Sequence, residues 1–190
     1  MSNIRIFVSH RIDIDSETVD TPVYFPVRCG AVYDEEGNSE IQGDDTGDNI
    51  SKLRMSFCEF TVQYWAWKNV DADYYGLCHY RRYLSFSDKR YKNTVFNMVR
   101  ELKLTPHEKK KYHLDDTKKI EKTVKQYDMI IPVVAKASEM SYNRAEVKTL
   151  REMWESYNGV DFEQGIIDKM FSLIKEYSPE YYNSACEYFS

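Results

Sequence analysis

The sequence lacks the features of an integral membrane protein and of a disulfide-stapled secreted domain. No stretch of its 190 residues approaches the roughly 20 apolar residues that a membrane-spanning helix needs. The segment from Met1 to His10 has no basic region ahead of an apolar core, so we expect no secretory signal and a cytoplasmic protein. The four cysteines include no Cys-x-x-Cys pair, which favours reduced thiols over a zinc site or a disulfide framework.

The chain also lacks an excess of positive charge. Its 26 lysines and arginines are outnumbered by 31 aspartates and glutamates, and the formal net charge is -5. A dedicated nucleic-acid binder normally presents a basic face that releases the counterions of phosphate groups, so we expect no nucleic-acid partner. Internal repeats and low-complexity segments are absent from the sequence as well. We therefore expect one domain over residues 1–190.

What is present is an alternation of strand-like and helix-like segments. Short apolar runs predict strands at residues 4–8, 23–27, the first half of 74–84, and 127–134. Strands that alternate with helices favour an α/β layer fold whose site lies at the carboxyl edge of the sheet.

Between these strands, apolar residues recur at helical spacing. We expect a strongly buried helix whose core face is formed by Leu53, Phe57, Phe60, Tyr64 and Trp67 and is widened by Cys58, Val62 and Trp65. Further helices are expected over 94–104, 147–157 and 162–177, with another that begins at Ser178. The polar range 34–47 predicts an exposed loop. The lysine-rich range 107–125 indicates a solvated helical face or loop rather than a membrane or polyanion patch.

Polar residues gather where the predicted strands end. His10 and Arg11 follow the first strand, and His79, Arg81 and Arg82 end the third. If the sheet is mainly parallel, these groups converge on one crevice. Two adjacent arginines and a histidine supply the donors that a diphosphate requires.

The segment from Asp48 to Ser51 adds to this crevice, because it opens the buried helix with three good N-cap residues, Asp48, Asn49 and Ser51. The free N–H groups at the start of a helix favour anions. An alternative stays open, in which the arginines leave the sheet edge only to pair with the acidic loop. In a strand Arg81 and Arg82 also point to opposite faces.

Several blocks of the sequence, taken in order, resemble one bacterial family. The most specific block runs from Gly76 to Tyr83 and reads Gly-Leu-Cys-His-Tyr-Arg-Arg-Tyr. The others are Asp48–Ser51, Cys58–Thr61, Tyr64–Asn69, Tyr127–Pro132 and, more loosely, Asp161–Phe162 and Ser178–Tyr181. The family is a domain of unknown function found in capsule, exopolysaccharide and O-antigen gene clusters, and its members are regarded as glycosyltransferases.

The resemblance implies a GT-A-like fold, a layered sheet with helices on both faces. It implies a hexosyltransferase that moves a galactose-type sugar from a UDP-sugar donor to a lipid-linked oligosaccharide acceptor at the inner face of the plasma membrane. Relatives commonly continue beyond the position of Ser190. We therefore expect either a form that lacks a C-terminal segment or one whose acceptor half lies elsewhere.

In this interpretation, donor binding is expected of His10, Asp48, Asn49, Ser51, His79, Tyr80, Arg81 and Arg82. The general base that deprotonates the acceptor hydroxyl is expected to be Asp128 or Glu59.

GT-A enzymes usually hold a metal on an Asp-x-Asp motif, and the comparable strand here has none. We infer that arginine and histidine stabilise the diphosphate without a metal. The alternative is that Asp44, Asp45 or Asp48 holds Mg²⁺ or Mn²⁺.

Two further functions remain open at this level. One is a noncatalytic module that binds a nucleotide sugar or glycan within a polysaccharide synthase assembly. The other is a polyanion-binding protein, whose binding would depend strongly on salt and not on the identity of the sugar.

Overall fold

The computed structural model describes residues 2–37, 40–89, 91, 94–95, 98–100, 104–132, 148–156 and 165–189. The chain divides into two compact units, Met1–Val133 and Val134–Ser190, and each is described by itself. Whether both belong to a single domain over residues 1–190 stays a prediction. None of the described helices combines the length and the apolar character that crossing a bilayer requires.

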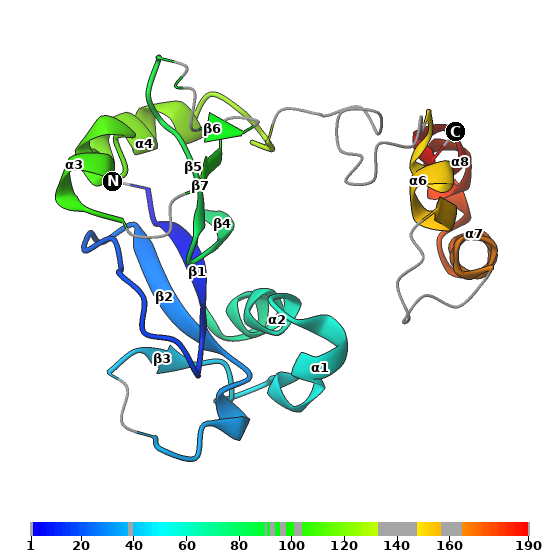
Figure 1. Ribbon diagram of the computed structural model, residues 1–190, viewed down its shortest axis with the longest axis horizontal. Coiled ribbons are helices and arrows are strands. Elements are labelled where there is room, and N and C mark those ends of the chain that lie inside the picture. The colour runs from blue at the N-terminus through cyan, green and yellow to red at the C-terminus, as the bar shows by residue number, and fades with distance from the viewer. Residues whose placement is uncertain are drawn as a thin grey trace. The chain divides into compact units, whose positions relative to one another are not determined.

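The first unit is built on a seven-stranded sheet with the strand order β3-β2-β1-β4-β5-β7-β6 (Figure 1). The four parallel strands are β1 (Ile4–Arg11), β2 (Tyr24–Cys29), β3 (Gln42–Gly43) and β4 (Tyr74–His79). The antiparallel strands are β5 (Arg82–Leu84), β6 (Thr94–Val95) and β7 (Met98–Arg100). The predicted α/β class is therefore confirmed.

Helices cover both faces of this sheet, as predicted. On one face, α2 (Phe60–Asn69) packs Val62 and Trp65 against Phe7 and Val27 of the sheet. On the other face, the segment that contains α3 (Pro106–Lys111) and α4 (Thr117–Val124) supplies Tyr112, Leu114 and Ile120, all 0% exposed, to the cluster around Val8 and Tyr83. Fully burying a large apolar side chain is worth about 1.5–3 kcal/mol, so these two layers supply the main core of the unit.

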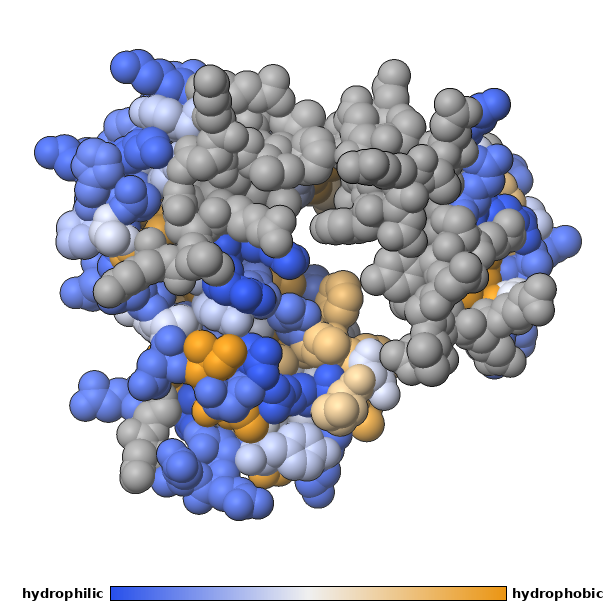
Figure 2. All heavy atoms as spheres, viewed as in Figure 1, coloured by the Kyte–Doolittle hydropathy of each residue, from blue (hydrophilic) through white to orange (hydrophobic). Residues whose placement is uncertain are grey.

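The predicted core face of the buried helix is confirmed at Val62 and Trp65 and wrong at four of its main residues. Leu53 and Phe57 are 47% exposed, Phe60 is 62% exposed and Trp67 is 65% exposed, and pale orange side chains gather over α1 and α2 in Figure 2. The residues that α2 buries are Thr61, Val62, Trp65 and Ala66.

The reason for this difference is a break in the helix. The segment forms a short 3-10 turn, η2 (Ser51–Leu53), then α1 (Arg54–Phe57), and Cys58 takes a positive φ of 46° before α2 begins. A residue with that backbone conformation ends the regular helical rotation, so a spacing of three and four that spans it no longer marks one face.

Two other predicted elements differ in the structure. Within the described part of the range 94–104, the chain forms the strands β6 and β7 rather than a helix, because β7 pairs with β5 and β6 pairs with β7. The predicted buried strand at 127–134 is not formed over Tyr127–Pro132, where the side chains are exposed, and its last two residues lie outside the described residues.

The lysine-rich range does form helices, and its termini explain why. Thr105 caps α3 by accepting a hydrogen bond from the backbone N–H of Glu108 at 3.4 Å, with Pro106 at the first position. Asp116 caps α4 by accepting from the N–H of Lys119 at 3.0 Å. Thr105 and Pro106 thus start a helix directly after the range 94–104.

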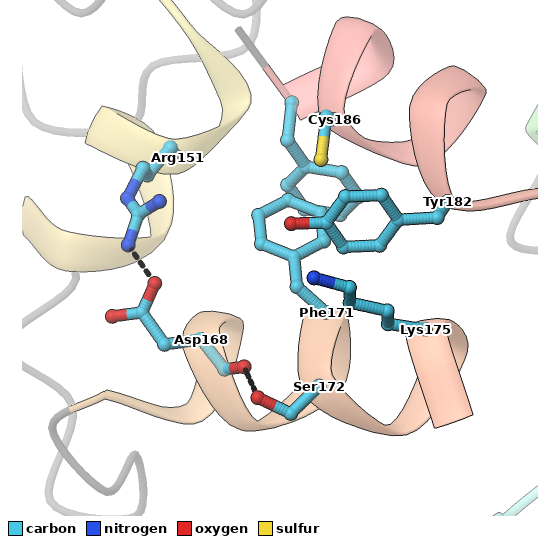
Figure 3. A pocket seen from close by; sticks show the side chains of 8 residues that line it. Arg151, Asp168, Phe171, Ser172, Lys175, Tyr182 and Cys186 are labelled. Carbon is cyan, nitrogen blue, oxygen red and sulfur yellow. Dashed lines mark hydrogen bonds and ion pairs between the residues drawn. The ribbon is translucent and has the colours of Figure 1, made fainter. Parts of the chain in front are cut away.

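The second unit consists of helices at the positions predicted for the described residues: α6 (Leu150–Ser156), α7 (Ile166–Tyr177), η3 (Pro179–Tyr181) and α8 (Tyr182–Phe189). The expected contributions of Val147, Tyr157 and Phe162 lie outside the described residues. The ring of Phe171 packs edge-on against Tyr182 and Phe189 beside a pocket of about 490 Å³, at whose rim Arg151 pairs with Asp168 (Figure 3).

The two tryptophans of α2 test the corrected helix face. Trp65 is 4% exposed and Trp67 is 65% exposed. We expect Trp65→Ala to lower the free energy of unfolding by about 3–5 kcal/mol, the usual cost of deleting a buried aromatic side chain. Trp67→Ala serves as the matched control and should cost less than about 1 kcal/mol, as surface substitutions do. Urea unfolding followed by circular dichroism measures both, and equal losses would contradict the assignment.

Candidate functional site

The carboxyl ends of the parallel strands bring the predicted site residues to one edge of the sheet. Ser9 in β1 pairs with His79 at the end of β4, and His10 pairs with Arg28 near the end of β2. On the far side of β2, Arg28 pairs with Gly43, the last residue of β3. His10 and His79 therefore lie at the same edge, as the predicted parallel sheet requires.

His10 is a buried histidine at this edge with one ring nitrogen left over. It is 2% exposed, and its Nδ1 lies 2.6 Å from the hydroxyl oxygen of Ser16. Its Nε2 is buried and has no hydrogen-bond partner in the described part of the chain. Burial, helped by the nearby charge of His79, lowers the pKa of His10 from 6.5 to about 4. The imidazole is therefore neutral at pH 7, able to orient a ligand without adding charge.

The second histidine, His79, connects β4 with the α1–α2 junction. Its Nε2 lies 3.5 Å from a carboxylate oxygen of Glu59, and its Nδ1 accepts a hydrogen bond from the backbone N–H of Arg81 at 3.1 Å. Burial lowers the pKa of His79, while the Glu59 carboxylate acts in the opposite direction. Glu59 keeps 46% of its side chain exposed, so a carboxylate that an incoming substrate can reach stands beside a histidine.

His79 is followed directly in the sequence by Tyr80, Arg81 and Arg82. Tyr80 is 7% exposed and packs its ring 4.2 Å from that of His79, with the Arg81 guanidinium 5.0 Å from the tyrosine ring. Arg81 lies in the turn after β4, and Arg82 begins β5; both are exposed. This edge thus presents two arginine side chains to solvent beside the Glu59–His79 pair.

The predicted donor-binding residues before the helix have their polar atoms engaged in the loop itself. The Asn49 side chain donates to the carbonyl oxygens of Asp45 and Gly47 and accepts from the N–H of Ser51. An oxygen of the Asp48 carboxylate accepts from the hydroxyl of Tyr64 at 3.1 Å. These contacts shape the loop, and a role in donor binding stays a prediction.

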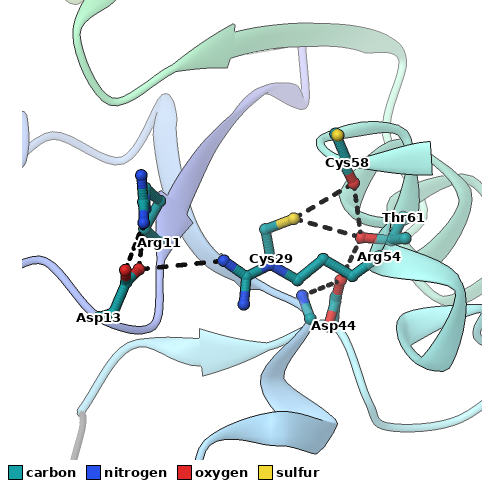
Figure 4. Close-up of polar contacts among 8 residues, drawn as sticks. Arg11, Asp13, Cys29, Asp44, Arg54, Cys58 and Thr61 are labelled. Atoms are coloured by element: carbon teal, nitrogen blue, oxygen red, sulfur yellow. Dashed lines mark hydrogen bonds and ion pairs between the residues drawn. The ribbon is translucent and has the colours of Figure 1, made fainter. Parts of the chain in front are cut away.

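A buried carboxylate, Asp44, organises this whole region. It is 0% exposed and accepts the backbone N–H groups of Gly30 and Ala31, both at 2.9 Å (Figure 4). It also accepts the hydroxyl of Ser51 at 2.6 Å and that of Thr61 at 2.5 Å. The expectation of an exposed loop is wrong at this residue, because a fully hydrogen-bonded carboxylate is one of the few charged groups that a protein interior accepts.

This arrangement does not suit a divalent cation. The two oxygens of Asp44 already receive four donors, which leaves no room for the oxygen-rich shell that Mg²⁺ prefers. Over the ranges that the structure describes, no three His, Cys, Asp or Glu side chains gather so as to hold a metal ion. Binding of Mg²⁺ or Mn²⁺ by Asp45 or Asp48 stays a prediction.

The other predicted catalytic acid, Asp128, lies apart from these groups. It is exposed in the segment after α4 and lines a cavity of about 490 Å³ together with Ile4, Ile6 and the residues of β4 from Tyr74 to Cys78. No contact among the described residues joins it to Glu59 or His79. The structure thus brings Glu59, His79, Tyr80 and the arginines together. Asp128 is not part of this group.

Sequence reasoning missed several polar residues at the same edge. Asp13 accepts from Arg11 and also lies near the guanidinium of Arg54, which starts α1 (Figure 4). Cys29 donates its thiol hydrogen to the carbonyl oxygen of Cys58 at 3.2 Å, and burial raises the pKa of that thiol. The one available signal was the alternation of charge in Arg11 and Asp13, because the remaining partners are far apart in the sequence.

The four hydrogen bonds that the Asp44 carboxylate accepts lead to a stability prediction. Asp44→Asn puts an amide N–H₂ where a carboxylate accepts donors, so we expect the free energy of unfolding to fall by about 3 kcal/mol or more. Asp45→Asn, one residue on and exposed, is the control and should stay within about 0.5 kcal/mol of the parent. Chemical unfolding measures both variants. An unchanged free energy of unfolding in Asp44→Asn would contradict the role of these hydrogen bonds.

The lowered pKa of His10 predicts a pH dependence of stability. The unfolded chain binds a proton at His10 near pH 6.5 and the folded chain only near pH 4, so stability is lost as the pH falls through that window. Between pH 7 and pH 4.5, we expect the free energy of unfolding of His10→Asn to fall by roughly 1–3 kcal/mol less than that of the parent chain. His107→Asn, at an exposed histidine, is the control. Urea unfolding at the two pH values measures the effect. Identical pH dependences of His10→Asn and the parent chain would contradict the assignment to His10.

Comparison with known proteins identifies the fold and the family of the chain. No curated protein sequence matches the chain. A solved structure of the bifunctional glycosyltransferase WbbM without ligand matches with a TM-score of 0.81 and 26% identity, over 98% of this chain and 31% of that one. This chain therefore spans about a third of its neighbour, and its sheet has the GT-A-like glycosyltransferase fold. A family model matches residues 5–190, and the chain belongs to the domain of unknown function family DUF4422.

Proposed function

We propose that this chain is a glycosyltransferase that binds a nucleotide-sugar donor at the carboxyl edge of β1, β2 and β4. The observation that carries the proposal is the exposed Glu59 carboxylate 3.5 Å from His79, at the same edge as the neutral His10 and the exposed arginines Arg81 and Arg82. The likeness to a solved glycosyltransferase supports the reaction class.

Each group at this edge has a task in sugar transfer. The acceptor hydroxyl must lose a proton as it attacks the anomeric carbon, and Glu59 is the accessible carboxylate beside a histidine that can hold it in place. The departing nucleotide diphosphate gains negative charge, which cations at the edge stabilise. The buried imidazole of His10 supplies a neutral hydrogen-bonding nitrogen.

The finer identity of the substrates follows the family resemblance. We propose a UDP-sugar donor with a galactose-type hexose and a lipid-linked oligosaccharide acceptor in surface polysaccharide synthesis. Contact with the inner face of the plasma membrane would bring the chain to such an acceptor. The alternative is a noncatalytic module that binds the nucleotide sugar within a larger synthase.

Of the two acids considered as general base, Glu59 is the one that the geometry supports, because Asp128 lines a cavity along β4 whose lining includes neither Glu59 nor His79. The full chain should be incubated with UDP-galactose, UDP-glucose and GDP-mannose, with Mn²⁺ or with a chelator. Release of nucleoside diphosphate and transfer to a lipid-linked acceptor are then measured.

We expect one donor to be turned over and Glu59→Gln to lower kcat by roughly a hundredfold or more, the usual contribution of a general base. Glu36→Gln, at an exposed glutamate in the loop after η1 (Ala31–Tyr33), is the matched control. Loss of turnover in Asp128→Asn but not in Glu59→Gln would reverse the assignment. Thermal stabilisation by a donor without any turnover would favour the noncatalytic module.

A further inference from the structure

A single carboxylate bridges two arginines at the carboxyl edge. Nε of Arg11 donates to Asp13 Oδ1 at 2.8 Å, and its Nη2 pairs with the other carboxylate oxygen. The guanidinium of Arg54 comes within 3.9 Å of Asp13 Oδ1 from the opposite side (Figure 4). Two positive charges thus share one negative charge, and this group keeps a surplus of one positive charge.

The position of Arg54 is built into the backbone. Gly30, at the turn after β2, has a φ of 70°, and a Cβ added there would lie 2.1 Å from Cδ of Arg54. The alkyl stem of Arg54 therefore lies directly over a turn that only glycine leaves open. The same turn is held in place by Asp44, which accepts the N–H of Gly30. The guanidinium is consequently aimed at the carboxyl end of β1 and not free to swing through solvent.

The carboxylate that joins the arginines is held weakly. The side chains of Asp13 and Arg11 are 51% and 46% exposed, and that of Arg54 is 24% exposed. Ion pairs between exposed side chains contribute little stability, because water screens them. Phosphate oxygens carry more charge than a carboxylate and match the fork of an arginine, so a diphosphate can replace Asp13 between the two guanidinium groups.

A buried nitrogen without a partner among the described residues lies at the same edge of the sheet, on the face opposite to Arg11, because successive side chains of a strand alternate between the two faces. His10 directly precedes Arg11 in β1, is 2% exposed, and has a buried Nε2 without a partner in the described part of the chain. A buried polar atom in that state is costly unless a ligand or water completes it.

We propose that Arg11 and Arg54 form the binding site for the diphosphate of the nucleotide-sugar donor, and that Asp13 holds the two guanidinium groups in place until phosphate oxygens replace its carboxylate. This inference rests on the proposed function for the identity of the donor. The anion site itself is defined by Arg11, Asp13 and Arg54 and can be tested without a sugar.

The test is calorimetric titration of the full chain with inorganic pyrophosphate and with UDP. Asp13→Asn removes the competing charge, and we expect it to raise the affinity for pyrophosphate roughly fivefold, the factor for two unit charges about 4 Å apart in water. Arg54→Met keeps the stem over Gly30 but removes the charge, and we expect it to lower both affinities about tenfold or more.

The matched control is another exposed Arg–Asp pair, Arg151 with Asp168 in the helical unit (Figure 3). Asp168→Asn removes the same charge from a similar pair and should leave the affinity for pyrophosphate unchanged. An equal gain in Asp168→Asn would show a general charge effect and overturn the proposal. Circular dichroism of Arg54→Met confirms that the variant is folded, and a folded variant with unchanged affinity would also overturn it.

Arg81→Met separates this site from the neighbouring arginine. If Arg81→Met loses UDP while Arg54→Met retains it, the diphosphate site is wrong and the glycosyltransferase assignment stands. If the Asp13 and Arg54 variants behave as expected but no nucleotide sugar is turned over, the anion site stands and the proposed reaction fails. Absence of any binding of pyrophosphate and UDP to the parent chain overturns the site.

Discussion

The arrangement of the carboxyl edge depends on the buried carboxylate of Asp44. An ionised carboxylate without water is stable only when its oxygens are satisfied by donors, and here two backbone amides and two hydroxyls do so. Those donors come from the turn after β2, from η2 and from the first turn of α2. One charge thus ties together three segments that would otherwise be independent loops and sets the directions from which Arg54 and Glu59 enter the site.

The same constraint separates polar residues that build the site from those that face a substrate. The hydroxyls of Ser51 and Thr61 donate hydrogen bonds to Asp44, and both residues are 0% exposed, so they are part of the scaffold. Glu59 follows the break at Cys58 and stays accessible beside His79. Because a rigid inner layer holds the outer side chains, the edge can keep cations and a carboxylate close together without their pairing off completely.

Local charge at this edge differs from that of the whole chain. The formal net charge is -5, yet Arg11, Arg54, Arg81 and Arg82 all lie where the parallel strands end. Arginines gathered in this way raise the local concentration of anionic ligands even on an acidic protein. The proposed nucleotide-sugar donor, whose anionic diphosphate lies between a neutral nucleoside and a neutral sugar, fits an edge with this distribution.

The features of the fold and the site that could be predicted are those set by residues close together in the sequence. The sequence by itself determined the parallel strands β1, β2 and β4 and the presence of a helix between β3 and β4, because apolar period and turn residues act over a few neighbours. It therefore also determined that His10 and His79 meet at one edge.

The tertiary structure alone decided the rest. A positive φ at Cys58 turned α2 so that Trp65 is buried and Trp67 exposed. Pairing of β7 with β5, and of β6 with β7, made Thr94–Val95 and Met98–Arg100 strands instead of a helix. The burial of Asp44 and the bridge from Asp13 to Arg54 join residues that are distant in the chain. Spacing within one segment carries no information about such partners, because only the packed sheet brings them within hydrogen-bonding reach.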